Sequence, residues 1–131
     1  MEVKAYMIVS IDSKSNTAIY EQLKAQIISG ILRNDLKEGE QLPSVRQLSG
    51  DLEINMHTVS KAYKLLENQG FIKISKKKGA FIHWDIKALK ITYEKEALLK
   101  EVNLQMMLYK HIYGNLEDIK KALEKMEVED E

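Results

Sequence analysis

Residues 42–72, LPSVRQLSGDLEINMHTVSKAYKLLENQGFI, decide the fold because two short helical patterns follow each other with a gap of only three residues. Ser44 and Gln47 form an S-x-x-Q capping box directly after the only proline, Pro43. This box predicts that a helix begins at Ser44. Its apolar positions are Val45, Leu48 and Leu52.

The second pattern begins at Asn55, a residue type that favours the N-cap position, and ends at Gly70, which suits the left-handed conformation that closes helices. Its apolar positions recur at intervals of three and four: Val59, Ala62, Tyr63 and Leu66. Neither helix is long enough to be stable alone. We therefore expect the pair to share a core with flanking elements.

The flanking segments supply such elements. Residues 17–33 predict an amphipathic helix that Thr17 caps and that Asn34 ends. A strand is predicted upstream at residues 6–11. After Gly70, the alternating runs FIKIS and AFIHW surround a four-residue turn, KKKG, and predict a β-hairpin. The order helix, helix, turn, helix, hairpin predicts a mainly α winged helix-turn-helix over residues 1–84.

Residues 85–131 predict a two-helix tail, with one helix near residues 86–113 and another near 115–127. Two helices cannot bury their own apolar stripes fully, so we expect them to pack against the same pair from a second chain. The positions expected at this dimer interface are Leu98, Val102, Met106, Tyr109, Tyr113, Leu116, Ile119 and Leu123. A cleft between tail and winged domain that holds an effector stays open as an alternative use of the tyrosines.

The charge is unevenly distributed, although the chain as a whole is neutral. Residues 41–84 carry seven Lys and Arg against three acids, a net of +4, whereas residues 117–131 carry three lysines against seven acids, a net of −4. The basic middle favours an anionic partner. Solvated surface charge is the plain alternative for both segments.

Several classes of protein are disfavoured. The absence of cysteine excludes disulfides and thiolate metal sites. No apolar run approaches the roughly 18 residues of a membrane span, and the N-terminus lacks the features of a signal peptide. We therefore expect a cytoplasmic protein. The residues also suggest no catalytic constellation, metal site or cofactor site, so we do not expect an enzyme.

The motifs IYEQL, GEQLPSVRQL, TVSKAYKLLENQG and KGAFI resemble, in order and spacing, the DNA-binding domain of GntR-family transcription regulators. The resemblance covers about residues 10–84, and the short tail is similar to that of the YtrA-like subfamily. It implies a homodimeric repressor that binds double-stranded DNA at an inverted repeat, often controlling transporter or cell-envelope genes. It leaves open the operator sequence and any effector.

Four positions depart from the family pattern. Ala18 stands where proline is usual and Asn34 where glycine is frequent, and both changes are compatible with the backbone expected there. Met56 replaces an arginine or proline, so an arginine contact to a base is missing. Lys77 replaces the first glycine of the wing and adds a charge.

The resemblance implies DNA contacts by Arg46, His57 and Thr58. A guanidinium can bind a phosphate or a guanine edge, and Arg46 is alternatively a surface residue paired with Asp51 or Glu53. The other candidates at the two helix starts are Ser44, Asn55, Ser60 and Lys61. Capping alone, or a solvated helix face, is the alternative for these four residues.

The hairpin turn supplies the remaining candidates. Lys77, Lys78 and Gly79, with Lys76 beside them, would reach phosphates or the minor groove. The alternative is a charged turn that keeps an edge strand soluble. A winged helix also serves in some proteins as a protein-interaction module without DNA binding, and a positive potential over the second helix of the pair and the wing would favour DNA.

Overall fold

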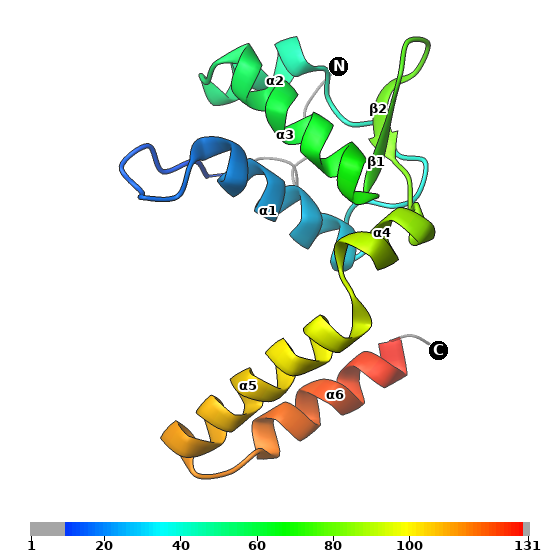
Figure 1. Cartoon of the computed structure of the whole chain (residues 1–131). Coiled ribbons are helices and arrows are strands. Elements are labelled where there is room, and N and C mark those ends of the chain that lie inside the picture. Colours follow the sequence, from blue (N-terminus) through cyan, green and yellow to red (C-terminus); the bar gives the residue numbers. More distant parts are fainter. Residues whose placement is uncertain (1–9, 130–131) are drawn as a thin grey trace. The chain divides into compact units, whose positions relative to one another are not determined.

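The computed structural model describes residues 10–129 (Figure 1). Six helices and two strands follow one another in this part of the chain. They are α1 (Ile19–Leu32), α2 (Val45–Leu52), α3 (Met56–Gln69), β1 (Ile72–Ser75), β2 (Gly79–Ile82), α4 (Ile86–Thr92), α5 (Lys95–Tyr113) and α6 (Glu117–Glu129). The mainly helical winged helix-turn-helix with a two-stranded antiparallel wing is confirmed.

The chain forms two compact units that divide between Thr92 and Tyr93. The first unit includes α4, which packs against α3, and therefore extends eight residues beyond the boundary drawn at Trp84 from the sequence. The second unit consists of α5 and α6. The assignment of the first part to DNA binding and of the second to dimerisation stays a prediction.

The core of the first unit lies between α1, α3 and the wing. Its members come from every element of the unit except α4, and they include Leu23, Ile27, Leu48, Val59, Tyr63, Leu66, Phe71 and Ile82. The Tyr63 hydroxyl donates a hydrogen bond of 2.8 Å to the Pro43 carbonyl. Burial raises the pKa of this hydroxyl. The bond ties the middle of α3 to the residue that precedes the α2 cap.

The predicted helix ends are confirmed within the helix pair. The Ser44 hydroxyl accepts a hydrogen bond from the Gln47 amide at 3.0 Å, and the Asn55 side chain accepts one from the His57 amide at 2.7 Å. Gly70 closes α3 with a φ of +106°. Between the helices, Glu53 takes a left-handed conformation with a φ of +55°. Local capping chemistry therefore sets the bounds of α2 and α3.

Three local predictions need correction. The N-cap of α1 is Ala18 and not Thr17. Of the strand predicted at residues 6–11, residues 6–9 lie outside the described residues, and Ser10 and Ile11 belong to no strand. The single helix predicted at residues 86–113 is two helices, because Glu94 has an extended backbone with a ψ of 136°.

The wing pairs Ile72 with Ile82 and Ser75 with Gly79. Its turn has three residues, 76–78, and not the four predicted, because Gly79 already belongs to β2. Gly79 has a φ of +68°, which explains the need for glycine at this position of a three-residue hairpin. The Ser75 hydroxyl accepts hydrogen bonds from the Lys77 and Lys78 amides at 3.2 and 3.0 Å.

Candidate nucleic-acid interface

The start of α3 presents several polar side chains to solvent. His57 and Lys61 are exposed, whereas Thr58 and Ser60 are half-buried and contact solvent over part of their surface. Asn55 is exposed and also caps the helix. These polar side chains at the start of α3 are therefore accessible to a partner. A helix that enters the major groove with its first turn requires such accessible side chains there.

Arg46 is exposed in the first turn of α2. The ion pairs found within residues 10–129 involve Lys24, His83 and Lys120, and none of them involves Arg46. The pairing of Arg46 with Asp51 or Glu53 is thus not formed. An exposed guanidinium without a carboxylate partner among residues 10–129 is well suited to a phosphate or a guanine edge.

Lys61 has a defined position despite its exposure. Its ammonium group lies 3.9 Å from the centroid of the Tyr20 ring on α1. Cation–π contacts of this kind contribute about 0.5–1 kcal/mol at exposed sites. Lys61 is therefore held at the edge between α1 and α3, where the sequence predicted only a solvated side chain or a DNA contact.

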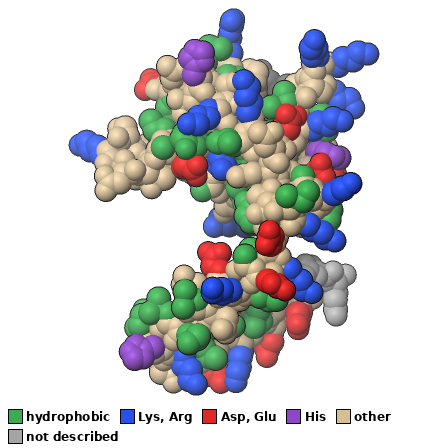
Figure 2. All heavy atoms as spheres, in the orientation of Figure 1, with side chains coloured by type: hydrophobic (Ala, Val, Ile, Leu, Met, Phe, Trp, Pro, Cys, Tyr) green, Lys and Arg blue, Asp and Glu red, His purple; other side chains and the backbone are tan. Residues whose placement is uncertain are grey.

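The turn of the wing carries Lys76, Lys77 and Lys78, which are all exposed. In the space-filling view, Lys and Arg side chains gather over the upper right of the first unit, where Figure 1 shows this turn (Figure 2). Figure 1 also shows α2 and the start of α3 toward the same end of the unit. The predicted DNA-contacting elements thus lie toward one end of the first unit, and each predicted contact with DNA stays a prediction.

Two residues outside the predicted set contribute to this region. Tyr20 holds Lys61, and the Gln41 side chain donates a hydrogen bond of 2.7 Å to the Lys78 carbonyl. Neither contact has a local sequence signal, because each joins residues that are far apart in the chain. Only knowledge of how α1 and the α1–α2 connection pack would have identified these two residues.

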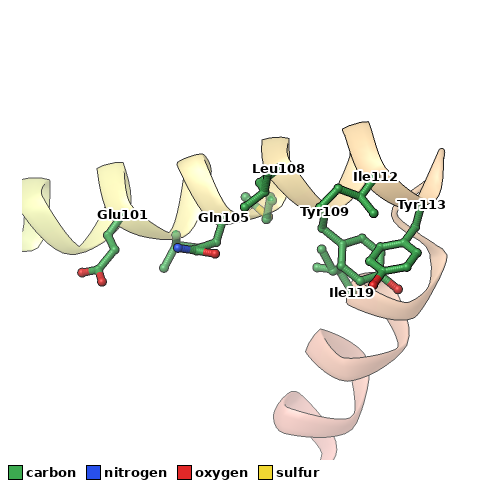
Figure 3. Close-up of a pocket in the computed structure, with 9 residues that line it drawn as sticks. Glu101, Gln105, Leu108, Tyr109, Ile112, Tyr113 and Ile119 are labelled. Atoms are coloured by element: carbon green, nitrogen blue, oxygen red, sulfur yellow. The ribbon is translucent and has the colours of Figure 1, made fainter. Parts of the chain in front are cut away.

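The tail forms an open apolar groove. Glu101, Gln105, Leu108, Tyr109, Ile112 and Tyr113 of α5 and Ile119 of α6 surround it (Figure 3), together with Val102 and Met106. The groove has a volume of about 610 Å³. The Tyr109 hydroxyl donates a 2.6 Å hydrogen bond to the Asp118 carboxylate, which joins the two helices.

The predicted dimer positions divide into two groups. Four are half-buried within the helix pair itself, namely Met106, Tyr109, Leu116 and Ile119. Four others, Leu98, Val102, Tyr113 and Leu123, are exposed by 44–65%. Leu104, Leu108 and Ile112 of α5, which are not among the predicted positions, are also more than half exposed. The helix pair thus buries only part of its apolar surface.

Residues 10–129 contain no group of three His, Asp or Glu side chains arranged to hold a metal ion. No helix in that range combines the length and the apolar character that a membrane span requires.

Comparison with known proteins identifies relatives of the chain. The model of the family described as bacterial regulatory proteins, gntR family, matches residues 16–82. The transcriptional repressor YtrA of Bacillus subtilis is 37% identical over 106 residues, which cover 81% of each chain.

Two solved structures are similar over most of their length. YtrA from Sulfolobus acidocaldarius, a GntR-family transcription factor, is 40% identical with a TM-score of 0.56, and the match covers 64% of this chain and 90% of that one. A transcriptional antiterminator from Listeria monocytogenes is 32% identical with a TM-score of 0.63, and the match covers 90% and 88% of the two chains.

Proposed function

Because the chain belongs to the gntR family of bacterial regulatory proteins, we propose that it is a homodimeric repressor that binds an inverted-repeat operator in double-stranded DNA. Each protomer places α3 in a major groove and its wing at the flanking backbone. The two half-sites then lie about one duplex turn of 10–10.5 base pairs apart, or a multiple of it. The protein acts in the cytoplasm, and transporter genes are the candidate targets.

The observation that carries this proposal is the composition of the exposed surface around α3. His57 and Lys61 of α3, Arg46 of α2 and the wing lysines are all exposed, and Arg46 has no carboxylate partner among residues 10–129. Phosphate contacts supply most of the affinity for DNA, whereas contacts to base edges supply specificity. This surface offers cations for the first task and short polar side chains for the second.

The tail supports the dimeric part of the proposal. Val102 and Tyr113 are 52% and 65% exposed, and they line the same apolar groove. Exposed apolar patches of this kind mark interaction sites in soluble proteins. A second copy of the helix pair would cover the groove and give the two-fold symmetry that an inverted repeat requires. The proposed dimer interface includes Leu104, Leu108 and Ile112 in addition to the eight positions predicted from the sequence.

Selection of bound fragments from random duplex DNA tests the DNA-binding part. We expect an inverted repeat to be enriched, with an affinity that falls steeply as salt rises. Arg46→Ala should weaken binding by about 1–3 kcal/mol if Arg46 contacts a base. Failure to enrich any sequence, together with an affinity for a protein partner, would support the interaction module instead.

A pair of substitutions on α5 tests the dimer. Val102→Glu places a charge in the exposed apolar groove and should yield monomers in sedimentation experiments, with loss of high-affinity binding to the full repeat. Lys100→Glu, two residues away on the same helix and also exposed, is the matched control and should remain dimeric. A wild-type chain that is monomeric at micromolar concentration would contradict this part of the proposal.

A further inference from the structure

The connection between α1 and α2 forms a third strand-like segment beside the wing. The Gly39 and Leu42 amides donate hydrogen bonds of 2.8 Å to the carbonyls of Ile82 and Ala80, and the Ile82 amide donates one of 2.8 Å to the Glu40 carbonyl. Residues 39–42 therefore follow β2 closely before the chain reaches the cap of α2. The wing is thus joined by its backbone to the segment that leads into the helix pair.

One side chain of this segment reaches the turn of the wing. The Gln41 Nε2 atom donates a 2.7 Å hydrogen bond to the Lys78 carbonyl, and it lies 3.6 Å from the place that a Cβ on Gly79 would occupy. On the other side of the turn, the Ser75 hydroxyl accepts from the Lys77 and Lys78 amides. Gln41 therefore ties the wing turn, which carries the lysines, to a segment outside the hairpin through this one side-chain hydrogen bond.

An open hollow of about 330 Å³ lies between this tie and the wing. Its lining consists of Gly39, Gln41, Lys77, Lys78 and Phe81. The Lys78 ammonium group lies 5.9 Å from the centroid of the Phe81 ring, so this side chain extends along β2. The hollow thus has two cationic side chains and the Gln41 amide at its edge, which are suitable donors to a phosphodiester oxygen.

We propose that Gln41 is a positioning residue of the DNA interface, which holds the wing turn so that Lys77 and Lys78 direct their ammonium groups at one backbone phosphate of the duplex. This inference rests on the proposed function. Without the Gln41 hydrogen bond, the turn keeps its charges, but the ammonium groups of Lys77 and Lys78 sample many orientations. Each contact with a phosphate then costs more side-chain entropy. The hairpin itself does not depend on Gln41, because its ladder and the backbone bonds of residues 39–42 remain.

The test compares Gln41→Leu with Gln26→Leu. Gln26 also donates an exposed side-chain hydrogen bond to a carbonyl, that of Ser10 at 3.0 Å, but it lies on α1 and this bond does not involve the wing. Affinity is measured as a function of salt with the duplex recovered by selection. We expect Gln41→Leu to weaken binding roughly three- to ten-fold and to make the salt dependence shallower by about one counterion, although no charge is removed. Gln26→Leu should change neither quantity.

A second comparison separates positioning from a general effect on stability. In a Lys77→Gln, Lys78→Gln background, Gln41→Leu should have no further effect on affinity, because the groups that it positions are absent. An unchanged salt dependence of Gln41→Leu, or an equal loss in both backgrounds, would overturn the inference alone. A wild-type chain that binds neither the selected duplex nor a mixed-sequence duplex would overturn the inference and the proposed function together.

Discussion

Replacement of Gly70 by alanine should destabilise the first unit strongly. Gly70 ends α3 with a φ of +106° and a ψ of 15°, a conformation that costs a residue with a Cβ about 1–3 kcal/mol. A Cβ there would lie 2.9 Å from the Asp85 carbonyl oxygen, 2.9 Å from Leu89 Cγ and 3.0 Å from the Leu89 amide nitrogen. Two of these atoms are backbone, and the Asp85 amide already donates to the Gly70 carbonyl at 2.9 Å. Relief requires α4 to move, which adds about 1–3 kcal/mol.

The matched control is Gly50→Ala. Gly50 lies inside α2, and an added Cβ there meets nothing within 4 Å. Alanine should therefore stabilise α2 by about 0.5–1 kcal/mol. Urea unfolding followed by the fluorescence of the single tryptophan, Trp84, measures both variants. Trp84 packs on the core with its ring centroid 6.3 Å from that of Phe71, so it reports on the first unit.

The two glycine variants should shift the unfolding midpoint in opposite directions. For Gly70→Ala we expect a combined loss of about 2–5 kcal/mol in the free energy of unfolding. A Gly70→Ala midpoint equal to that of the wild type would refute the close contact between the end of α3 and the start of α4. If both midpoints move in the same direction, Gly50 and Gly70 do not differ as described, with Gly50 helical and Gly70 left-handed.

The remaining predictions concern two tyrosines. Tyr63→Phe should lower the free energy of unfolding by about 1–2 kcal/mol, because the buried Pro43 carbonyl loses its donor; an unchanged urea midpoint would contradict this. The hydrogen bond to Asp118 raises the pKa of Tyr109. The protonated Tyr109 hydroxyl therefore stabilises the tail fully below the ordinary tyrosine pKa of about 10. This stabilisation is lost as the pH rises through the raised pKa of the folded state. In an ultraviolet titration, the Tyr109→Phe variant should lack one of the tyrosines that titrate with a raised pKa in the wild type. If the variant instead lacks a tyrosine with an ordinary pKa, the prediction is wrong.

The sequence predicted those parts of the fold whose cause is local. Ser44, Asn55 and Gly70 act within a few residues of their own positions, through caps or backbone conformation. The apolar spacing of α3 likewise identifies its buried face, because helical periodicity depends only on residues a few positions apart. These local causes explain why the helix pair and the wing are recognisable in the sequence.

The errors arise where tertiary packing decides. The break at Glu94 divides the helix predicted at residues 86–113, because Leu89 packs against the core of the first unit, whereas α5 belongs to the second. The contacts of Tyr20 with Lys61 and of Gln41 with Lys78 are also long-range. Neither helical periodicity nor a capping residue indicates such contacts. The candidate DNA-binding residues were therefore predictable from the sequence, whereas Tyr20 and Gln41, which contact two of them, were not.

The α1–α2 connection couples the parts of the candidate interface. Residues 39–42 bind β2, and Gln41 reaches the wing turn. Pro43, the next residue, accepts the hydrogen bond from Tyr63 of α3, and Ser44 then caps α2. Six consecutive residues thus contact the wing, α3 and α2 in turn. A displacement of this segment would alter the wing and both helices at once, so substitutions here should have non-additive effects on DNA binding, even though none of these side chains needs to touch a base.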